Sequence, residues 1–274
     1  MLLLSLMTNK TLYAKPRQMT KHYLITRFSV RYSKLANPKS WLEKRLELFH
    51  RYTLPCVKNQ TDQNFTWLLL IAPNTPIGVR TTLKNAAENI ELLEIPDDYI
   101  DPEMDDRRAH TDLYTYIAEH IQAELKNTPV TRLITTRTDS DDLIAHTFIE
   151  NIKKHATLDT HKKYVIDMLN GAMYSTRTRR GKVQTTYNRQ IKKRRNSYKP
   201  SQFISLVEPL DADISTVYCN YHCTINDHFK VITPIAPELQ WCWLVENGTN
   251  WTTGRRHLRK DRGELIRSNF PELQ

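Results

Sequence analysis

The sequence predicts an α/β protein in which a mostly parallel sheet is flanked by helices. Residues 65–72, FTWLLLIA, are almost continuously apolar, as expected for a strand that is buried on both faces of a sheet. Shorter strand-like runs precede and follow it, and segments with helical periodicity separate these runs. Strands that alternate with helices favour parallel pairing, because each helix carries the chain back to the same end of the sheet.

The first half of the chain predicts three to four strand–helix repeats. Residues 22–30 form the first predicted strand, and Ser40 can cap the helix that follows over 41–54. One face of that helix is apolar and the other polar: Leu42, Leu46 and Phe49 against Lys44, Arg45 and Glu47. The remaining predicted elements are strands at 65–72, 90–95 and 133–136, helices at 76–88 and 107–125, and an acidic loop at 96–106.

The second half of the chain is richer in strand-like sequence. Residues 164–174 favour β-structure with an interruption at Asn170-Gly171, and further strands are predicted at 203–207, 216–225 and 241–245. A polar helix is predicted at 255–267. No linker divides the chain, so we expect one domain over 22–274, made of a nucleotide-binding half (22–155) and a β-rich half (156–274), after a flexible tail at 1–21.

Composition limits the classes of function. The chain has 274 residues and a formal net charge of +10, which favours anionic partners such as nucleic acid, acidic lipid or nucleotide phosphates. Only 6 glycines are present, and no glycine-rich phosphate loop is among them. The 4 cysteines do not resemble a secreted disulfide framework, so we expect reduced thiols and a cytoplasmic location. We expect no membrane span, since residues 1–7 are apolar but too few to cross a bilayer.

An acidic motif follows the predicted strand 133–136. Asp139 and Asp141, in D-x-D spacing, end this strand, and Asp142 stands next to them. Carboxylates at the carboxyl end of a strand lie where open α/β sheets bind ligands, and oxygen ligands suit Mn²⁺ or Mg²⁺. A competing interpretation is a solvated turn or a helix cap, because the apolar face formed by Leu143, Ile144, Phe148 and Ile149 predicts a helix directly after the acids.

Several segments in the same order resemble the rhamnosyltransferase family. They are 26–30 (TRFSV), 41–60, 64–67 (NFTW), 136–142 (TRTDSDD), 203–208 (FISLVE), 216–222 (TVYCNYH) and 243–250 (WLVENGTN). The resemblance implies a glycosyltransferase of the A-type fold. Such an enzyme moves a sugar, here rhamnose or another deoxy or pentose sugar, from a UDP- or dTDP-sugar donor to an acceptor hydroxyl, with inversion.

The resemblance also implies roles for individual residues. Asp139, Asp141 and His222 would bind the metal, with His228 a weaker third ligand, and Arg137 and Asp139 would contact the donor. Thr26, Arg27 and Phe28 would lie where the nucleotide base rests. The catalytic base stays open among Glu208, Glu246, Asp211 and Asp213, while Asp142 either takes part in catalysis, completes the metal shell or caps a helix. Relatives often carry histidine at the position of Glu246.

A second interpretation is an enzyme that acts on nucleic acid. Residues 177–195 hold nine Lys or Arg and no acid, so they form either a solvated hairpin or an anion-binding segment. The enzyme would then be a glycosyltransferase with a DNA or RNA acceptor, or a metal-dependent nuclease whose second acid cluster comes from Asp97, Asp98, Asp105 and Asp106. For a glycosyltransferase, a glycan or a lipid-linked sugar is an equally suitable anionic acceptor.

Overall fold

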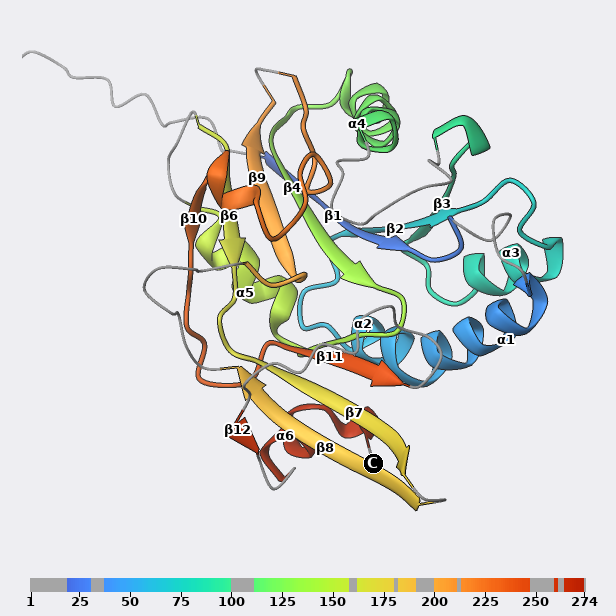
Figure 1. Ribbon diagram of the computed structural model, residues 1–274. Helices are drawn as coiled ribbons and strands as arrows, with labels where there is room; N and C mark the ends of the chain where they lie inside the picture. The colour runs from blue at the N-terminus through green and yellow to red at the C-terminus, as the bar shows by residue number, and fades with distance from the viewer. Residues whose placement is uncertain are drawn as a thin grey trace, which may run out of the picture.

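The computed structural model describes residues 19–30, 37–99, 111–157, 162–179, 182–190, 200–210, 213–246, 259–260 and 264–273. Two sheets organise this part of the chain (Figure 1). The larger sheet has 7 strands in the order β10-β6-β9-β4-β1-β2-β3. Its strands are β1 (Met19–Arg27), β2 (Thr66–Ile71), β3 (Ile90–Glu94), β4 (Val130–Asp139), β6 (Tyr164–Asp167), β9 (Ile204–Pro209) and β10 (Lys230–Ile232).

The larger sheet is mostly parallel. Strands β4, β1, β2 and β3 run parallel to one another, and β10 runs parallel to β6. Only β9 is antiparallel to both strands beside it. The predicted fold class, α/β with a mostly parallel sheet flanked by helices, is therefore confirmed. Strands from the second half of the chain complete the sheet begun by the first half.

Helices cover both faces of this sheet. Along β1, Leu24 packs into a core with Phe49 and Phe148, whereas Tyr23 and Ile25 pack into a second core on the other face. The first core lies against α1 (Pro38–Leu48), α2 (Leu54–Lys58) and α5 (Phe148–His155), and the second lies against α4 (Thr111–Leu125). Helix α3 (Ile77–Lys84) joins β2 to β3, and a π-helical turn, Phe49–Thr53, joins α1 to α2.

The smaller sheet has 5 strands in the order β12-β8-β7-β11-β5. They are β5 (Leu143–Ile144), β7 (Gly171–Arg179), β8 (Lys182–Gln190), β11 (Trp241–Glu246) and β12 (Arg259–Lys260). Strands β7 and β8 form a long hairpin that extends away from the larger sheet (Figure 1). The short helix α6 (Glu264–Asn269) lies close to this sheet.

Three predicted elements are wrong. The acids at 139–142 do not lead directly into a helix, because β5 pairs with β11 first and α5 begins only at Phe148. Residues 216–225 are turns that end in a short 3-10 helix, Ile225–Asp227, rather than a strand. Of the closing helix predicted at 255–267, residues 259–260 form strand β12 and only the end, from Glu264, belongs to a helix, α6, while 255–258 and 261–263 lie outside the described part.

The remaining predicted elements are found with shifted ends. The first strand begins at Met19, inside the predicted tail, and ends at Arg27, so Phe28 to Val30 follow it. The first helix begins earlier, at Pro38, and continues through the π-helical turn to Lys58. The helix predicted at 107–125 is described from Thr111 onward. Residues 100–106 of the predicted acidic loop lie outside the described part.

Candidate active site

The acidic turn joins the two sheets. Strand β4 ends at Asp139 in the larger sheet, and β5 begins at Leu143 in the smaller one, so residues 140–142 form the passage between them. The β-branched and threonine-rich sequence of β4 favours an extended strand that carries Asp139 to its carboxyl end. In the parallel register Asp139 lies opposite Arg27, the last residue of β1. The turn therefore occupies the sheet edge at which α/β proteins bind ligands.

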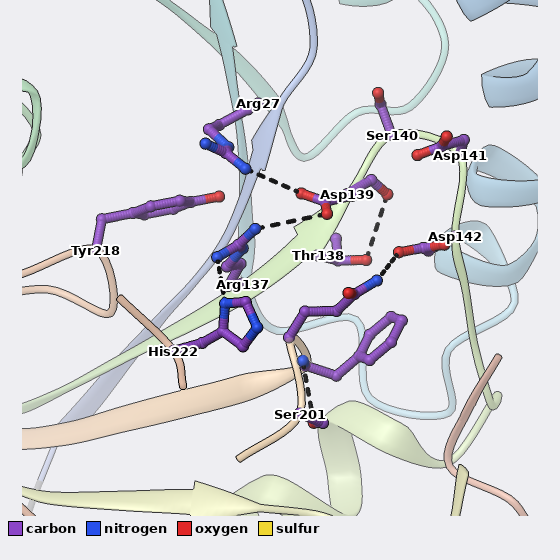
Figure 2. Close-up of polar contacts among 12 residues, drawn as sticks. Arg27, Arg137, Thr138, Asp139, Ser140, Asp141, Asp142, Ser201, Tyr218 and His222 are labelled. Carbon is purple, nitrogen blue, oxygen red and sulfur yellow. Dashed lines mark hydrogen bonds and ion pairs between the residues drawn. The ribbon is translucent and has the colours of Figure 1, made fainter. Parts of the chain in front are cut away.

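Two arginines face the Asp139 carboxylate (Figure 2). Arg27 Nη2 lies 3.8 Å from Asp139 Oδ1, and Arg137 Nη2 lies 3.5 Å from Oδ2. Both distances exceed the usual length of a hydrogen-bonded ion pair, and the Asp139 side chain is 26% exposed. Burial alone would raise the pKa of Asp139, but the cations Arg137, Arg27 and Arg45 hold it below its usual value. Asp139 is therefore a carboxylate at neutral pH.

Asp141 is held by a different cation. Arg45 Nη1 of α1 lies 2.8 Å from Asp141 Oδ1 and 3.3 Å from Ser140 Oγ. The Arg45 guanidinium also lies over the Trp41 ring, 5.0 Å from its centroid. The Asp141 side chain is only 7% exposed, and burial raises its pKa although Arg45 opposes this. Arg45, on the predicted polar face of this helix, thus packs against the acidic turn.

Asp142 is a structural residue of the turn, which corrects its predicted catalytic role. Its Oδ1 accepts a hydrogen bond from the Leu244 backbone N–H (2.8 Å), and its Oδ2 accepts one from Gln202 Nε2 (2.6 Å). Thr53, in the π-helical turn, donates to its carbonyl oxygen at 2.9 Å. Both carboxyl oxygens are occupied and the residue is 2% exposed, so burial and the neighbouring acids Asp141 and Asp139 raise its pKa well above the usual value.

Tyr218 and His222 lie beside the two arginines that face Asp139 (Figure 2). The guanidinium carbons of Arg27 and Arg137 lie 5.8 Å and 5.6 Å from the centroid of the Tyr218 ring. Arg137 Nη1 lies 3.2 Å from His222 Nδ1, where the arginine donates and the neutral imidazole accepts. His222 therefore contacts Arg137, but among the described residues Asp139, Asp141 and His222 do not bring their ligand atoms close enough together to share a metal ion. His228, the weaker candidate, is exposed.

Thr26 and Phe28 are not free to contact a nucleotide, which corrects their predicted role. Thr26 is fully buried, and its Oγ1 accepts a hydrogen bond from Trp67 Nε1 at 3.0 Å. Phe28 is 2% exposed and packs edge-to-face on Phe49 with ring centroids 5.3 Å apart. Arg27, between them, is the residue of this strand end that reaches the site.

Glu208 does not reach the acidic turn, so its prediction as the catalytic base is wrong. It lies opposite Leu133 in the β4–β9 register, six positions before Asp139 along β4, or about 20 Å at the usual rise of a strand. Its carboxylate is buried and accepts two backbone N–H groups. Asp213 is exposed and lies near this same end, since its carbonyl oxygen accepts a hydrogen bond from Lys163.

Two further candidates for the base lie beyond the described side chains. Asp211 is outside the described residues altogether. Glu246 is the last residue of β11, where its backbone lies opposite Thr176, but its side chain is not described. Strand β11 passes directly beside the acidic turn, because Leu244 bonds Asp142 and Cys242 lies opposite Leu143. Glu246 follows Leu244 by two residues.

Sequence reasoning missed Arg45 and Tyr218. Arg45 stands on the polar side of an amphipathic helix, and its partner Asp141 is 96 residues away, so no local pattern connects them. Tyr218 falls in a segment that the sequence predicts as a strand. The one local signal was composition, because arginine and aromatic residues cluster around the acidic motif and the segment 216–222.

Among the described side chains, Glu91, His120 and Glu124 bring their ligand atoms within 4.8 Å of one another, close enough to hold a metal ion, and none of the three belongs to the acidic turn. All four cysteines are free thiols, as the sequence predicts. The spacing Cys219-x-x-His222-Cys223 is compatible with zinc ligands, but these residues do not form such a group among the described side chains. No described helix combines the length and the apolar character needed to cross a bilayer.

The fold and the site define an α/β protein with an arginine-lined acidic turn at the carboxyl edge of its sheet. Comparison with family models then identifies the family: residues 21–241 match the model described as "Putative rhamnosyl transferase", so the chain belongs to this glycosyltransferase family. A search of curated proteins finds no match.

Solved structures with some similarity include TarS of S. aureus. The full TarS chain is 10% identical with a TM-score of 0.40, over 82% of this chain and 37% of that one. The TarS 1–349 fragment in complex with UDP is 10% identical with a TM-score of 0.38, over 82% of this chain and 60% of that one. The inositol-1-phosphate CTP transferase from T. maritima is also 10% identical, with a TM-score of 0.40, over 85% and 93%. The chain thus spans about a third of the full length of TarS.

Proposed function

We propose that the protein is a metal-dependent, inverting glycosyltransferase of the A-type fold. It would move rhamnose, or another deoxy or pentose sugar, from a UDP- or dTDP-sugar to an acceptor hydroxyl. One observation carries this proposal: Arg27 and Arg137 flank Asp139 at the carboxyl ends of the neighbouring parallel strands β1 and β4. Family membership supports the reaction class, and it favours sugar transfer over the alternative of a nuclease.

The arginines suit the diphosphate of such a donor. Guanidinium groups bind phosphate oxygens through two parallel hydrogen bonds, and three guanidiniums, of Arg27, Arg45 and Arg137, gather around the turn. Asp139 and Asp141 carry the opposite charge. When both acids are ionised, the three arginines and two aspartates together have a net charge of +1. Negative charge that develops on the leaving diphosphate would be stabilised there.

The residues also fit a divalent cation, Mn²⁺ or Mg²⁺. Asp139 is ionised, partly exposed and held by its arginines only at 3.5 Å and 3.8 Å, so its oxygens keep capacity for a hard cation. Asp141 Oδ1 contacts Arg45, and His222 Nδ1 accepts a hydrogen bond from Arg137, so the other ring nitrogen of His222 carries the proton. Asp139 would therefore be the main ligand, and Asp141 and His222 would join it once the diphosphate draws Arg45 and Arg137 away. The ion would neutralise charge on the diphosphate.

Glu246 is our proposed catalytic base. It ends the strand that binds the acidic turn through Leu244, and the other candidates among described residues lie far away or are fully hydrogen-bonded. A carboxylate in this position would take the proton from the acceptor hydroxyl as the bond to the sugar forms. Residues 22–155 would then form the nucleotide-sugar half and residues 156–274 the acceptor half.

The β7–β8 hairpin supports an anionic acceptor. Residues 177–195, of which this hairpin forms part, hold nine Lys or Arg and no acid. This charge favours an anionic ligand. A glycan phosphate, a lipid-linked sugar or a nucleic acid meets this requirement; the nucleic-acid acceptor is the second candidate. Free thiols at every cysteine agree with the cytoplasmic location that we propose.

A panel of nucleotide sugars tests the proposal. Wild-type protein is mixed with UDP-, dTDP-, GDP- and CDP-sugars, with Mn²⁺ or with EDTA, and the melting temperature and nucleotide release are measured. A cognate donor should raise the melting temperature by mass action and release nucleoside diphosphate only with metal. Absence of both effects for every donor would contradict the proposed function.

A further inference from the structure

Glu208 holds the segment that carries Tyr218 and His222. Its Oε2 accepts a hydrogen bond from the Ser215 backbone N–H at 2.9 Å, and its Oε1 accepts one from Thr216 N–H at 3.0 Å. The residue is 1% exposed and belongs to β9, an interior strand of the larger sheet. A carboxylate with both oxygens bound to consecutive backbone amides fixes the backbone between them, because each bond is charge-assisted and excluded from water.

Lys163, the residue before β6, reinforces this contact. Its Nζ lies 3.2 Å from Glu208 Oε2, donates to Ser215 Oγ at 2.6 Å and donates to the carbonyl oxygen of Asp213. The buried carboxylate therefore has a counter-charge, and that same cation binds the segment at two further points. From β4, Thr135 Oγ1 accepts a hydrogen bond from the Val217 N–H at 2.8 Å.

The held backbone is strained at Thr216. This is the non-glycine residue with positive φ among the described residues, at 57°, a conformation that β-branched side chains rarely adopt. Its side chain is fully buried, and its Oγ1 has no hydrogen-bond partner in the described structure. The Thr216 carbonyl accepts a local hydrogen bond from the Cys219 N–H at 3.2 Å, and the bonds from Glu208, Lys163 and Thr135 hold the residues on either side of it.

The strained turn directs the next residues to the candidate active site. Two residues later, Tyr218 places its ring beside the guanidiniums of Arg27 and Arg137. The Tyr218 hydroxyl lies 3.4 Å from the Ile25 carbonyl oxygen. His222 Nδ1 lies 3.2 Å from Arg137 Nη1. We propose that Glu208, together with Lys163, is a positioning residue that sets the donor site through this segment, although it lies about 20 Å from Asp139. The inference rests on the proposed function, since it assumes that Arg27 and Arg137 bind the donor diphosphate.

The test is a double-mutant cycle with a separate readout for the segment itself. In Glu208→Gln the amide can accept one backbone N–H but presents its own N–H₂ to the other, and Lys163 loses its counter-charge. Calorimetry measures the affinity for UDP and dTDP in this variant, in Tyr218→Ala and in the double variant. Hydrogen exchange measures the protection of the 215–217 amides. Glu150→Gln, an acid-to-amide change on α5, is the control.

We expect Glu208→Gln to weaken nucleoside diphosphate binding about tenfold and to expose the 215–217 amides to exchange. In the Tyr218→Ala background the same change should have little further effect, because Glu208 acts through that ring. Additive losses, or unchanged affinity with exposed amides, would overturn the positioning role. If wild-type protein binds neither nucleotide, the proposed function fails, and exchange alone still reports whether Glu208 holds the segment.

Two more variants keep the test valid if Glu208→Gln folds poorly. Lys163→Met keeps the carboxylate and should weaken binding in the same direction by less, while Lys162→Met, at an exposed neighbour, should not. Adding Thr216→Gly to Glu208→Gln should restore part of the affinity, because glycine adopts positive φ without strain. Equal binding by Lys163→Met and wild type, or no recovery with Thr216→Gly, counts against the inference.

Discussion

Arg27 and Asp139 end neighbouring parallel strands and lie opposite each other in the register, with Arg27 Nη2 3.8 Å from Asp139 Oδ1. Because the strands are parallel, both side chains emerge at the same edge of the sheet. Their separation is longer than a hydrogen-bonded ion pair. An incoming phosphate group can therefore take the guanidinium while the carboxylate remains available to a cation.

Replacing Arg27 should affect the diphosphate of the donor and not its nucleoside. We expect Arg27→Gln to raise the dissociation constant for UDP about tenfold, the usual effect of losing a hydrogen bond to a charged group, and to leave the affinity for uridine unchanged. Isothermal calorimetry with both ligands measures the difference. The control is Arg51→Gln, an exposed arginine that lies over Tyr52. Equal losses for UDP and uridine would point instead to a general disturbance of the fold.

Glu246 should matter for transfer and not for donor binding. We expect Glu246→Gln to lower the rate of sugar transfer by about 10²- to 10⁴-fold, the range typical of a lost general base. The dissociation constant for UDP should remain at the wild-type value. Single-turnover assays and calorimetry give the two quantities. A variant with normal transfer would remove Glu246 from the mechanism.

Buried His22 should make the protein sensitive to acid. Burial, and to a smaller extent the nearby Lys153, lower its pKa to about 3, while its Nε2 lies 2.7 Å from Thr136 Oγ1. Since the folded pKa lies below the unfolded value near 6.5, protons bind the unfolded chain preferentially, and stability is lost as pH falls through this window. His22 should lower the free energy of unfolding by about 1.4 kcal/mol per pH unit between pH 6 and pH 4.

Urea denaturation across this pH range measures the effect of His22. His22→Gln keeps an amide near Thr136 but cannot titrate, so its stability should depend less steeply on pH than that of the wild type. His155→Gln, at an exposed histidine on α5, should retain the wild-type slope. Identical slopes for all three proteins would show that His22 titrates normally.

The basic segment should govern the acceptor. Lys192, Lys193, Arg194 and Arg195 follow β8 and lie outside the described residues, so their role stays a prediction from the sequence. Replacing all four with Gln should raise the acceptor Michaelis constant, with little change in donor hydrolysis. The effect should shrink as salt rises, because phosphate contacts release counterions. Unchanged acceptor kinetics at low salt would show that this segment does not bind the acceptor, and would remove the main support for an anionic acceptor.

The sequence predicts the frame of the molecule better than its active site. The apolar run of β2 and the threonine-rich β4 are local signals, and the predicted parallel pairing is found between β2 and both its neighbours and between β4 and β1. The acidic motif likewise gives the position of Asp139, because a strand that ends in carboxylates is visible in one short segment. These features depend on neighbouring residues alone.

The remainder of the site depends on contacts that no local pattern contains. Glu208 comes at the end of an apolar run, a position that is compatible with a buried catalytic acid. Strand β9 is antiparallel, however, so Glu208 lies at the end of β4 away from the acidic turn. The sequence suggests Asp142 as a metal ligand. In the structure its carboxylate instead accepts a hydrogen bond from the backbone N–H of Leu244, which lies 102 residues later in the chain. Arg45 and Tyr218 reach the turn only through tertiary packing. Antiparallel insertion and long-range hydrogen bonds thus decide which of the predicted residues meet.

The measurement that tests the central claim most directly is the transfer rate of wild type and Asp139→Asn, with Mn²⁺ and with EDTA. Asp139→Asn keeps the shape and removes the charge, and loss of a metal ligand typically removes several kcal/mol of transition-state stabilisation. We predict metal-dependent turnover for the wild type, a rate at least about 100-fold lower for Asp139→Asn, and retained UDP binding by both. Full turnover in EDTA, or a normal rate for Asp139→Asn, would contradict a metal-dependent glycosyltransferase centred on Asp139.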